Sequence, residues 1–202
     1  MPELLTPLWL LALVGIAAYL IGAIPFGIVM ARLMGLGDLR KMGSGNIGAT
    51  NVMRTGNKVA GVLTFLLDAG KGAIVALIAW ASLGEDAAQI AALMAFVGHI
   101  YPVYLKFFGG KGVATFIGTS LALAWPVGLA LCALWLVTFK LTRYSSLSAL
   151  VVTALSPLLV HVFGFGSMFA LFLAFAVMVF YKHEANIRRL LAGTEARFGS
   201  GK

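Results

Sequence analysis

Long apolar runs separated by short polar segments are the dominant pattern along the chain. A helix that crosses a bilayer needs about 20 consecutive apolar residues, and five runs approach or exceed that length. These runs cover residues 4–31, 59–83, 87–105, 112–139 and 144–181. The pattern therefore predicts a protein made almost entirely of transmembrane helices.

Three positions are expected to interrupt these runs. Pro25 is expected to kink the first helix, because proline removes a helical hydrogen bond. Trp125-Pro126 divides the fourth run, since proline is favoured in the first turn of a helix. The turn-forming residues Gly164 to Ser167 divide the fifth run. With both divisions the chain has seven spans, and without the division at Trp125-Pro126 it has six.

The distribution of Lys and Arg favours seven spans. With seven, the loops at 84–86, 125–126 and 164–166 face outward and contain no Lys or Arg, as the positive-inside rule requires. With six spans, the basic tail would lie outside. The sequence therefore predicts an all-α integral membrane protein with about seven transmembrane helices. We expect a single domain over residues 1–202, with the N-terminus outside and the C-terminus cytoplasmic.

Composition supports a membrane protein and disfavours other classes. Hydrophobic residues make up 61% of the 202 positions and charged residues 11%, against about 45–50% and 25% in soluble domains. No basic residue precedes the first apolar run, so a signal peptide is not expected. The net charge of +8 is unevenly distributed along the chain, and we interpret that distribution as a determinant of membrane topology. Nucleic acid is not an expected partner. The single cysteine, Cys132, has no metal-ligand spacing around it.

Polar residues concentrate in four segments, of which the first runs from Gly43 to Arg54. It contains a G-x-G-x-x-G pattern, but a dinucleotide site requires that pattern between a strand and a helix, and helices flank it here. Glycine-rich backbone still binds anions through its N–H groups. The donors beside it are Ser44, Asn46, Thr50, Asn51 and Arg54. An ordinary solvated loop is the alternative interpretation.

The second polar segment follows the third apolar run. It resembles a P-loop only superficially, because Gly112 follows Lys111 where that motif has Ser or Thr. Gly110, Lys111 and Gly112 open a helix, and so offer free N–H groups, a helix dipole and an ammonium group to an anion. A helix start with a snorkelling lysine is the alternative. His99 is an intramembrane ionisable residue and hence a functional candidate, with a neutral packing histidine as the alternative.

The third and fourth segments are 140–146 and the tail from Tyr181 to Glu195. Ser146 is a candidate helix N-cap, and Arg143 is either an anion ligand or a topology signal. His183 and Asn186 are three apart and share a helix face, although an amphipathic helix on anionic lipid gives the same pattern. Together the four segments predict a site for an anionic, phosphorylated substrate at one membrane face.

Three of these segments resemble the signature motifs of one family, the bacterial acyl-phosphate-dependent glycerol-3-phosphate acyltransferases. The motifs occur in the family's order, and the match covers essentially the whole chain. The matching residues are Gly43 to Asn51, Gly98 to Pro102 with Gly109 to Thr115, and His183 with Asn186 and Arg189. The resemblance implies acyl transfer from acyl phosphate to the 1-hydroxyl of sn-glycerol 3-phosphate, giving lysophosphatidic acid and inorganic phosphate, without metal or cofactor.

The resemblance also implies a location and partners. It places the chain in the bacterial inner membrane as a multi-pass protein whose site faces the cytoplasm. Membrane lipid surrounds it, and a soluble enzyme that makes acyl phosphate is a candidate partner. The catalytic candidates are Ser44, Lys111, Ser146 and His183. The candidates for substrate binding are Asn46, Thr50, Asn51, Arg54, His99, Gly110, Gly112, Arg143 and Asn186.

The mechanism and one ion pair are left open by the residues alone. No His-x-x-x-x-Asp motif is present, so we expect catalysis by positioning and charge stabilisation, with a substrate phosphate accepting the hydroxyl proton. The rivals are an acyl-enzyme on Ser44 or Ser146 and a histidine base at 99 or 183. Asp68 and Lys71 are expected to pair, either as a structural ion pair or at the edge of the pocket. A small transporter for an anionic solute is the alternative function, disfavoured because no internal repeat is present.

Overall fold

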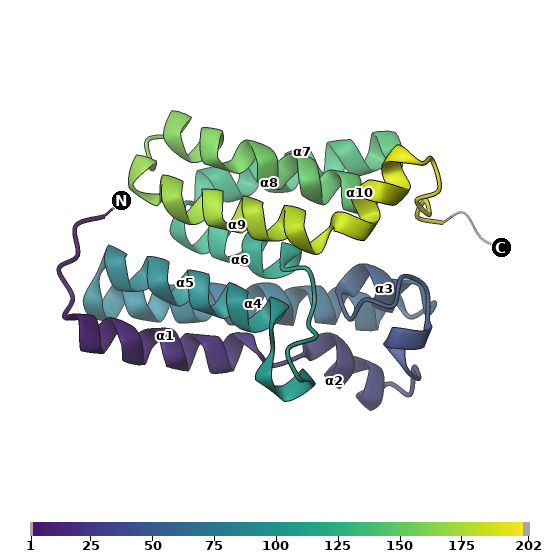
Figure 1. Cartoon of the computed structure of the whole chain (residues 1–202), viewed down its shortest axis with the longest axis horizontal. Helices are drawn as coiled ribbons and strands as arrows, with labels where there is room; N and C mark the ends of the chain where they lie inside the picture. Colours follow the sequence, from purple (N-terminus) through teal and green to yellow (C-terminus); the bar gives the residue numbers. More distant parts are fainter. Residues whose placement is uncertain (1, 200–202) are drawn as a thin grey trace. The chain divides into compact units, whose positions relative to one another are not determined.

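The computed structural model describes residues 2–199, and all of its regular structure is helical, with no strand in that range (Figure 1). Predictions that involve Met1 or residues 200–202 lie outside the described residues. The helices form two compact units, an N-terminal unit over 2–123 and a C-terminal unit over 124–199. That the chain forms a single domain over residues 1–202 stays a prediction.

The long helices α4 (Lys58–Leu83) and α5 (Glu85–Ile100) form the centre of the N-terminal unit. Helix α5 packs against both α1 and α4, and α4 also packs against α6. The unit consists of α1 (Leu8–Gly22), α2 (Phe26–Leu33), η1 (Leu39–Lys41), α3 (Ala49–Met53), α4 (Lys58–Leu83), α5 (Glu85–Ile100), η2 (Val103–Leu105) and α6 (Val113–Leu123). The polar segments that carry the first two motifs are the connections α2–α4 and α5–α6. The helices therefore hold both connections in one unit.

Glycines allow these helices to pack with their backbones in contact. A Cβ atom on Gly22 would overlap the backbone of Ala95, and one on Gly98 would overlap the Tyr19 carbonyl oxygen. The same holds between α4 and α6, where a Cβ atom on Gly118 would overlap the Ala69 carbonyl. Small residues at helix contacts are typical of membrane proteins, in which close van der Waals packing replaces a hydrophobic driving force.

The C-terminal unit is built from α7 (Trp125–Thr142), α8 (Ser145–Val162), η3 (Gly166–Met168), α9 (Phe169–Lys182) and α10 (Glu184–Leu191). Helix α8 packs against both α7 and α9. Between the η3–α9 segment and α10 the chain bends by 64°. After α10 it folds back, and the Phe198 N–H donates to the Arg143 carbonyl at 2.8 Å. The tail thus returns to the turn between α7 and α8.

The predicted helix breaks are confirmed. Pro25 separates α1 from α2, so the predicted kink is a full interruption. Helix α6 ends at Leu123 and α7 begins with Pro126 in its first turn. Between α8 and α9 the chain turns at Gly164, whose φ of +84° is favourable only for glycine.

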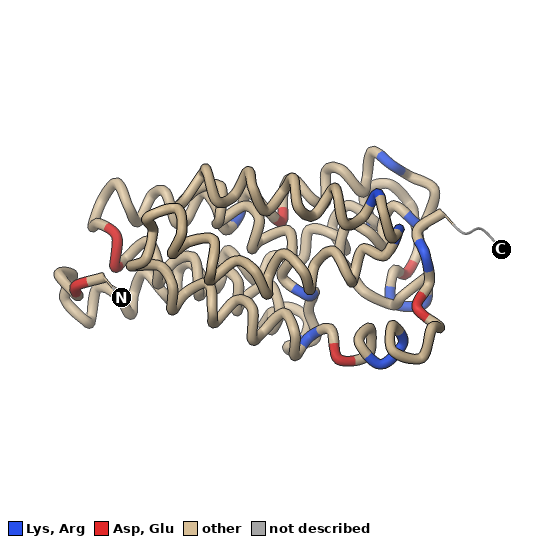
Figure 2. Tube along the Cα trace, turned by 90° about the horizontal axis from the view of Figure 1, so that it is seen from above, with Lys and Arg blue, Asp and Glu red and all other residues tan. Residues whose placement is uncertain are grey.

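The number of spans stays a prediction. Within residues 2–199, five helical segments are long and apolar enough to cross a membrane, and the bent pair of α9 and α10 makes up to six. Helix α6 is apolar but shorter, over Val113–Leu123. Within the N-terminal unit most Lys and Arg lie in the connections α2–α4 and α5–α6, at one end of its helices, and within the C-terminal unit they lie at the α7–α8 turn and after α9. Figure 2 marks these residues in blue. That arrangement supports the predicted orientation, in which this end faces the cytoplasm.

We expect Gly98→Ala to lower the free energy of unfolding by about 1–3 kcal/mol, because the new methyl group must displace the backbone of α1. The matched control is Gly70→Ala on α4, where a Cβ atom has no heavy atom within 4 Å. Thermal unfolding in detergent measures both variants. Equal melting temperatures for the two would contradict the packing described here.

Candidate functional site

The first motif is organised by Asn51, a buried residue of α3. Its Nδ2 group donates to the carbonyls of Leu39, Met42 and Asn46 at 3.0, 3.0 and 2.8 Å. Its Oδ1 atom accepts from the Ser44 N–H at 2.9 Å. Both ends of the amide therefore hold the backbone of the loop. The sequence predicts that Asn51 binds substrate, and a contact through its Nδ2 group would require exchange of the bonds to these carbonyls.

The rest of the loop presents its side chains from this fixed backbone. Asn46 Oδ1 accepts from the Gly48 N–H at 2.8 Å, which forms the turn that leads into α3. Gly43 has a φ of +53°, and a Cβ atom there would overlap Asn51 Oδ1. Ser44 and Arg54 are exposed. A hydroxyl and a guanidinium are thus offered to solvent beside rigid backbone, as an anion site requires.

The second motif packs on α5 through its glycines. The Gly110 N–H donates to the His99 carbonyl at 3.1 Å. A Cβ atom on Gly110 would overlap His99 Nε2, and one on Gly112 would overlap the Phe96 ring. Lys111 lies between these glycines and is half-buried, two positions before α6 begins at Val113. The first N–H groups of α6 have no helical acceptor, so this loop is also suited to an anion.

A hydrogen bond joins the two motif regions. Arg40 Nη2 donates to the Phe108 carbonyl at 3.0 Å. Beside that carbonyl, Lys106 and Phe107 adopt the left-handed conformation, with φ values of 53° and 66°, which is uncommon for residues other than glycine. Sequence reasoning did not single out Arg40 as a site residue. In the sequence, Arg40 was only one of many basic residues at the predicted cytoplasmic face.

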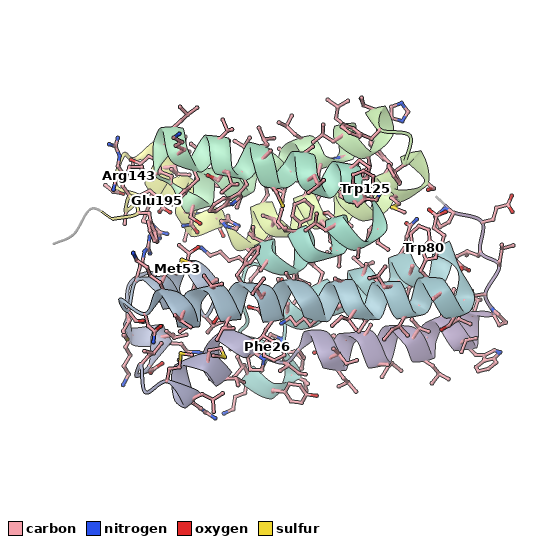
Figure 3. The ribbon with its side chains drawn as sticks, turned by 180° about the vertical axis from the view of Figure 1, so that it is seen from behind. Phe26, Met53, Trp80, Trp125, Arg143 and Glu195 are labelled. Carbon is pink, nitrogen blue, oxygen red and sulfur yellow. The ribbon has the colours of Figure 1, made fainter. Side chains whose placement is uncertain are left out.

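In the C-terminal unit the candidate residues surround a carboxylate. Glu195 Oε1 accepts from Ser146 Oγ and from Asn186 Nδ2, each at 2.6 Å, and Glu195 Oε2 accepts from Arg189 Nε at 2.7 Å. The Glu195 side chain is 8% exposed. Figure 3 shows Glu195 and Arg143 at the same end of this unit, with Trp125 at the other. Sequence reasoning missed Glu195, whose only signal was that it is one of two acids in a basic tail.

The interpretation of Ser146 as a helix N-cap is wrong. Helix α8 begins at Ser145 with Tyr144 as its N-cap residue. Ser146 lies one position inside the helix, where its hydroxyl is directed to Glu195 and not to the backbone. The other candidate of this turn, Arg143, is exposed and ends α7 in the left-handed conformation.

His183 is buried at the junction of α9 and α10. Its Nδ1 atom lies 2.9 Å from the Val179 carbonyl oxygen. Because a carbonyl only accepts, Nδ1 carries a proton. The ring is therefore oriented by a backbone carbonyl.

The Glu195 carboxylate is held in its charged form. Burial raises the pKa of Glu195, but the hydrogen bonds from Ser146, Asn186 and Arg189 outweigh it, so that the pKa lies below its ordinary value. A carboxylate with a lowered pKa is a weak base. Glu195 is therefore suited to holding Ser146 and Asn186 in place, and poorly suited to removing a proton from Ser146.

The fold and these segments define a class of protein, a multi-pass helical membrane protein with glycine-rich, basic segments suited to a phosphorylated ligand. The chain belongs to the glycerol-3-phosphate acyltransferase family, whose profile matches residues 12–193. A glycerol-3-phosphate acyltransferase of Cereibacter sphaeroides is 62% identical over 199 residues, covering 98% of this chain and 99% of the relative. One of Dinoroseobacter shibae is 57% identical over 202 residues and the full length of both chains.

Solved structures agree with this assignment. A crystal structure of PlsY (YgiH), an integral membrane glycerol 3-phosphate acyltransferase in its glycerol 3-phosphate form, is 43% identical with a TM-score of 0.89. It covers 94% of this chain and 96% of its own. The lysophosphatidic acid form of PlsY is 40% identical with a TM-score of 0.86, at the same coverage. The resemblance inferred from the motifs is confirmed, and this chain is a bacterial membrane glycerol-3-phosphate acyltransferase of phospholipid biosynthesis.

We expect Asn51→Ala to lower acyltransferase activity by at least about tenfold, because a misplaced loop costs alignment of the substrate. The control is Asn57→Ala. Asn57 caps α4 by accepting from the Ala60 N–H at 2.9 Å, and its loss is expected to cost about 1 kcal/mol of stability with little change in turnover. An Asn51→Ala enzyme with the kcat and KM of wild type would show that the loop does not depend on this amide.

A second expectation concerns pH. Because the folded-state pKa of Glu195 is lowered, its carboxylate contributes stability above the ordinary pKa of about 4.3, and that contribution is lost as pH falls through the folded value. The melting temperature of wild type should exceed that of Glu195→Gln at pH 7, and the gap should narrow below about pH 4.3. Glu184→Gln is the control, since Glu184 forms only an exposed pair with Arg188 on α10. A gap independent of pH would contradict the assignment.

Proposed function

We propose that the chain transfers a fatty acyl group from acyl phosphate to the 1-hydroxyl of sn-glycerol 3-phosphate, releasing lysophosphatidic acid and inorganic phosphate. The observation that carries this proposal is the glycine-rich loop at 109–112, packed on His99 and carrying Lys111 two positions before α6. Such a loop is suited to a phosphate group. The related PlsY structures are a glycerol 3-phosphate form and a lysophosphatidic acid form, which supports this acceptor and this product.

The mechanism follows from the chemistry of the donor. Acyl phosphate is already activated, so the attacking hydroxyl oxygen forms a bond to the acyl carbon while the bond from that carbon to the phosphate oxygen breaks. Phosphate leaves with the bonding electrons. Lys111, Arg54 and backbone N–H groups stabilise the charge on the phosphates. A substrate phosphate oxygen, with a second pKa of about 6, accepts the hydroxyl proton.

This route requires no acidic partner for a histidine. The His183 ring is oriented by the Val179 carbonyl, and Ser146 faces a carboxylate that is a weak base. Both arrangements favour positioning over an acyl-enzyme. As the resemblance implies, Ser44, Asn46 and Arg54 then bind phosphate or glycerol oxygens of the substrate, and Gly110, Lys111 and Gly112 hold a phosphate. In the C-terminal unit, His183 and Asn186 are the candidates that the resemblance adds.

The proposed location is the bacterial inner membrane with the site at the cytoplasmic face. The acyl chain stays in lipid, and glycerol 3-phosphate enters from the aqueous side. The clustering of Lys and Arg at one end of the helices supports this orientation. A soluble enzyme that makes acyl phosphate is the partner that this orientation would serve.

The test is an acyl-transfer assay of the purified protein in lipid, with labelled glycerol 3-phosphate and either palmitoyl phosphate or palmitoyl-CoA. We expect lysophosphatidic acid from palmitoyl phosphate alone, and Lys111→Met to lower kcat/KM at least about 100-fold, because a charge that stabilises the transition state is lost. Lys140→Met, at the exposed end of α7, is the control and should keep wild-type activity. Product from palmitoyl-CoA alone would overturn the donor assignment.

A further inference from the structure

Three ionisable side chains lie buried together where α4 faces α5. Asp68, Lys71 and His99 are 2%, 5% and 5% exposed. Lys71 Nζ lies 2.9 Å from Asp68 Oδ1, which confirms the predicted pairing, and His99 Nδ1 lies 3.5 Å from the same oxygen. An isolated charge at this depth would be strongly destabilising, so each member depends on the others.

One side of this cluster is fastened to the neighbouring helices. Lys71 Nζ donates to the Ile24 carbonyl at 2.9 Å, at the break between α1 and α2. The Asp68 carbonyl accepts from Thr115 Oγ1 of α6, also at 2.9 Å. Asp68 is therefore fixed both through its side chain and through its backbone. It offers His99 an immobile carboxylate.

The other side of the cluster touches the glycine-rich loop. While Nδ1 lies 3.5 Å from Asp68 Oδ1, the Nε2 edge of the His99 ring lies beside Gly110, where no Cβ fits. The carbonyl of His99 holds the Gly110 N–H. A rotation of the imidazole would therefore press directly on the loop. Through the contact at Gly110, the orientation of the His99 ring therefore determines where the backbone beside Lys111 lies.

We propose that Asp68 and Lys71 are positioning residues, which fix the His99 ring and through it hold the loop at 109–112 in its phosphate-binding conformation. The inference rests on the proposed function, because it takes this loop as the phosphate site. A positioning role differs from that of a purely structural ion pair, which well-packed neutral side chains could replace without loss of activity. Neither Asp68 nor Lys71 contacts substrate in this proposal.

The variants that test it are Asp68→Asn, His99→Gln and the double substitution of both. A further variant combines Asp68→Asn with Lys71→Met, which removes both charges at nearly constant volume and keeps the site neutral if a single change fails to fold. The matched control is Asp86→Asn. Asp86 is another buried carboxylate of this unit and accepts from the Leu5 and Thr6 N–H groups, about 20 Å along α5 from His99.

Two readouts apply to every variant. Hydrogen–deuterium exchange over residues 106–115, measured without substrate, reports the loop itself. Steady-state kinetics with whichever donor wild type accepts report kcat and both KM values. Because exchange needs no substrate and the donor is identified on wild type, failure of the acyl phosphate assignment is separated from failure of this inference.

We expect faster exchange at 109–112 and at least a tenfold lower kcat/KM in Asp68→Asn, in His99→Gln and in the neutral Asp68→Asn, Lys71→Met pair. The double variant Asp68→Asn, His99→Gln should have a kcat/KM no lower than that of the less active single variant, because both substitutions act through the same ring. Asp86→Asn should lose stability only. A neutral pair with wild-type exchange and kinetics would overturn the proposal, and so would losses at Asp68 and His99 that multiply.

Discussion

The absence of water in the hydrocarbon of a membrane is the constraint on which the other features of this protein depend. A backbone amide there must find its partner within the protein, which leaves the helix as the regular structure. At three places where the helices stop, a buried side chain forms hydrogen bonds with the backbone. Lys71 serves the Ile24 carbonyl between α1 and α2, Asp86 serves the amides of Leu5 and Thr6 before α1, and Asn51 serves four backbone groups of the loop before α3.

The same constraint explains the use of glycine. Helices that gain little from excluding water must gain from close contact, and Gly22 and Gly98 bring α1 and α5 together at their backbones. In the loop at 109–112 glycine has a second use, because it brings main-chain N–H groups and the His99 ring within contact distance. Packing and anion binding thus require the same residue type for related reasons.

The two units use charge in different ways. In the N-terminal unit an acid and a base are paired deep in the helices, where each compensates the other. In the C-terminal unit Glu195 is anionic and collects three donors, two of which, Ser146 and Asn186, the family resemblance assigns to the site. An internal carboxylate that occupies such donors fixes their directions. In the proposed mechanism, a carboxylate that fixes such donors supports catalysis by positioning.

The sequence by itself determined the helical membrane class, the family, the breaks at Pro25, Trp125-Pro126 and Gly164, and the pairing of Asp68 with Lys71. Each of these depends on residues close together in the chain or on a motif read directly. Only the tertiary structure decided that Asp68 meets His99, that Asn51 holds its own loop, and that Glu195 and not the helix backbone engages Ser146. Those contacts join residues on different helices or at opposite ends of a loop, and local periodicity carries no information on how such segments pack.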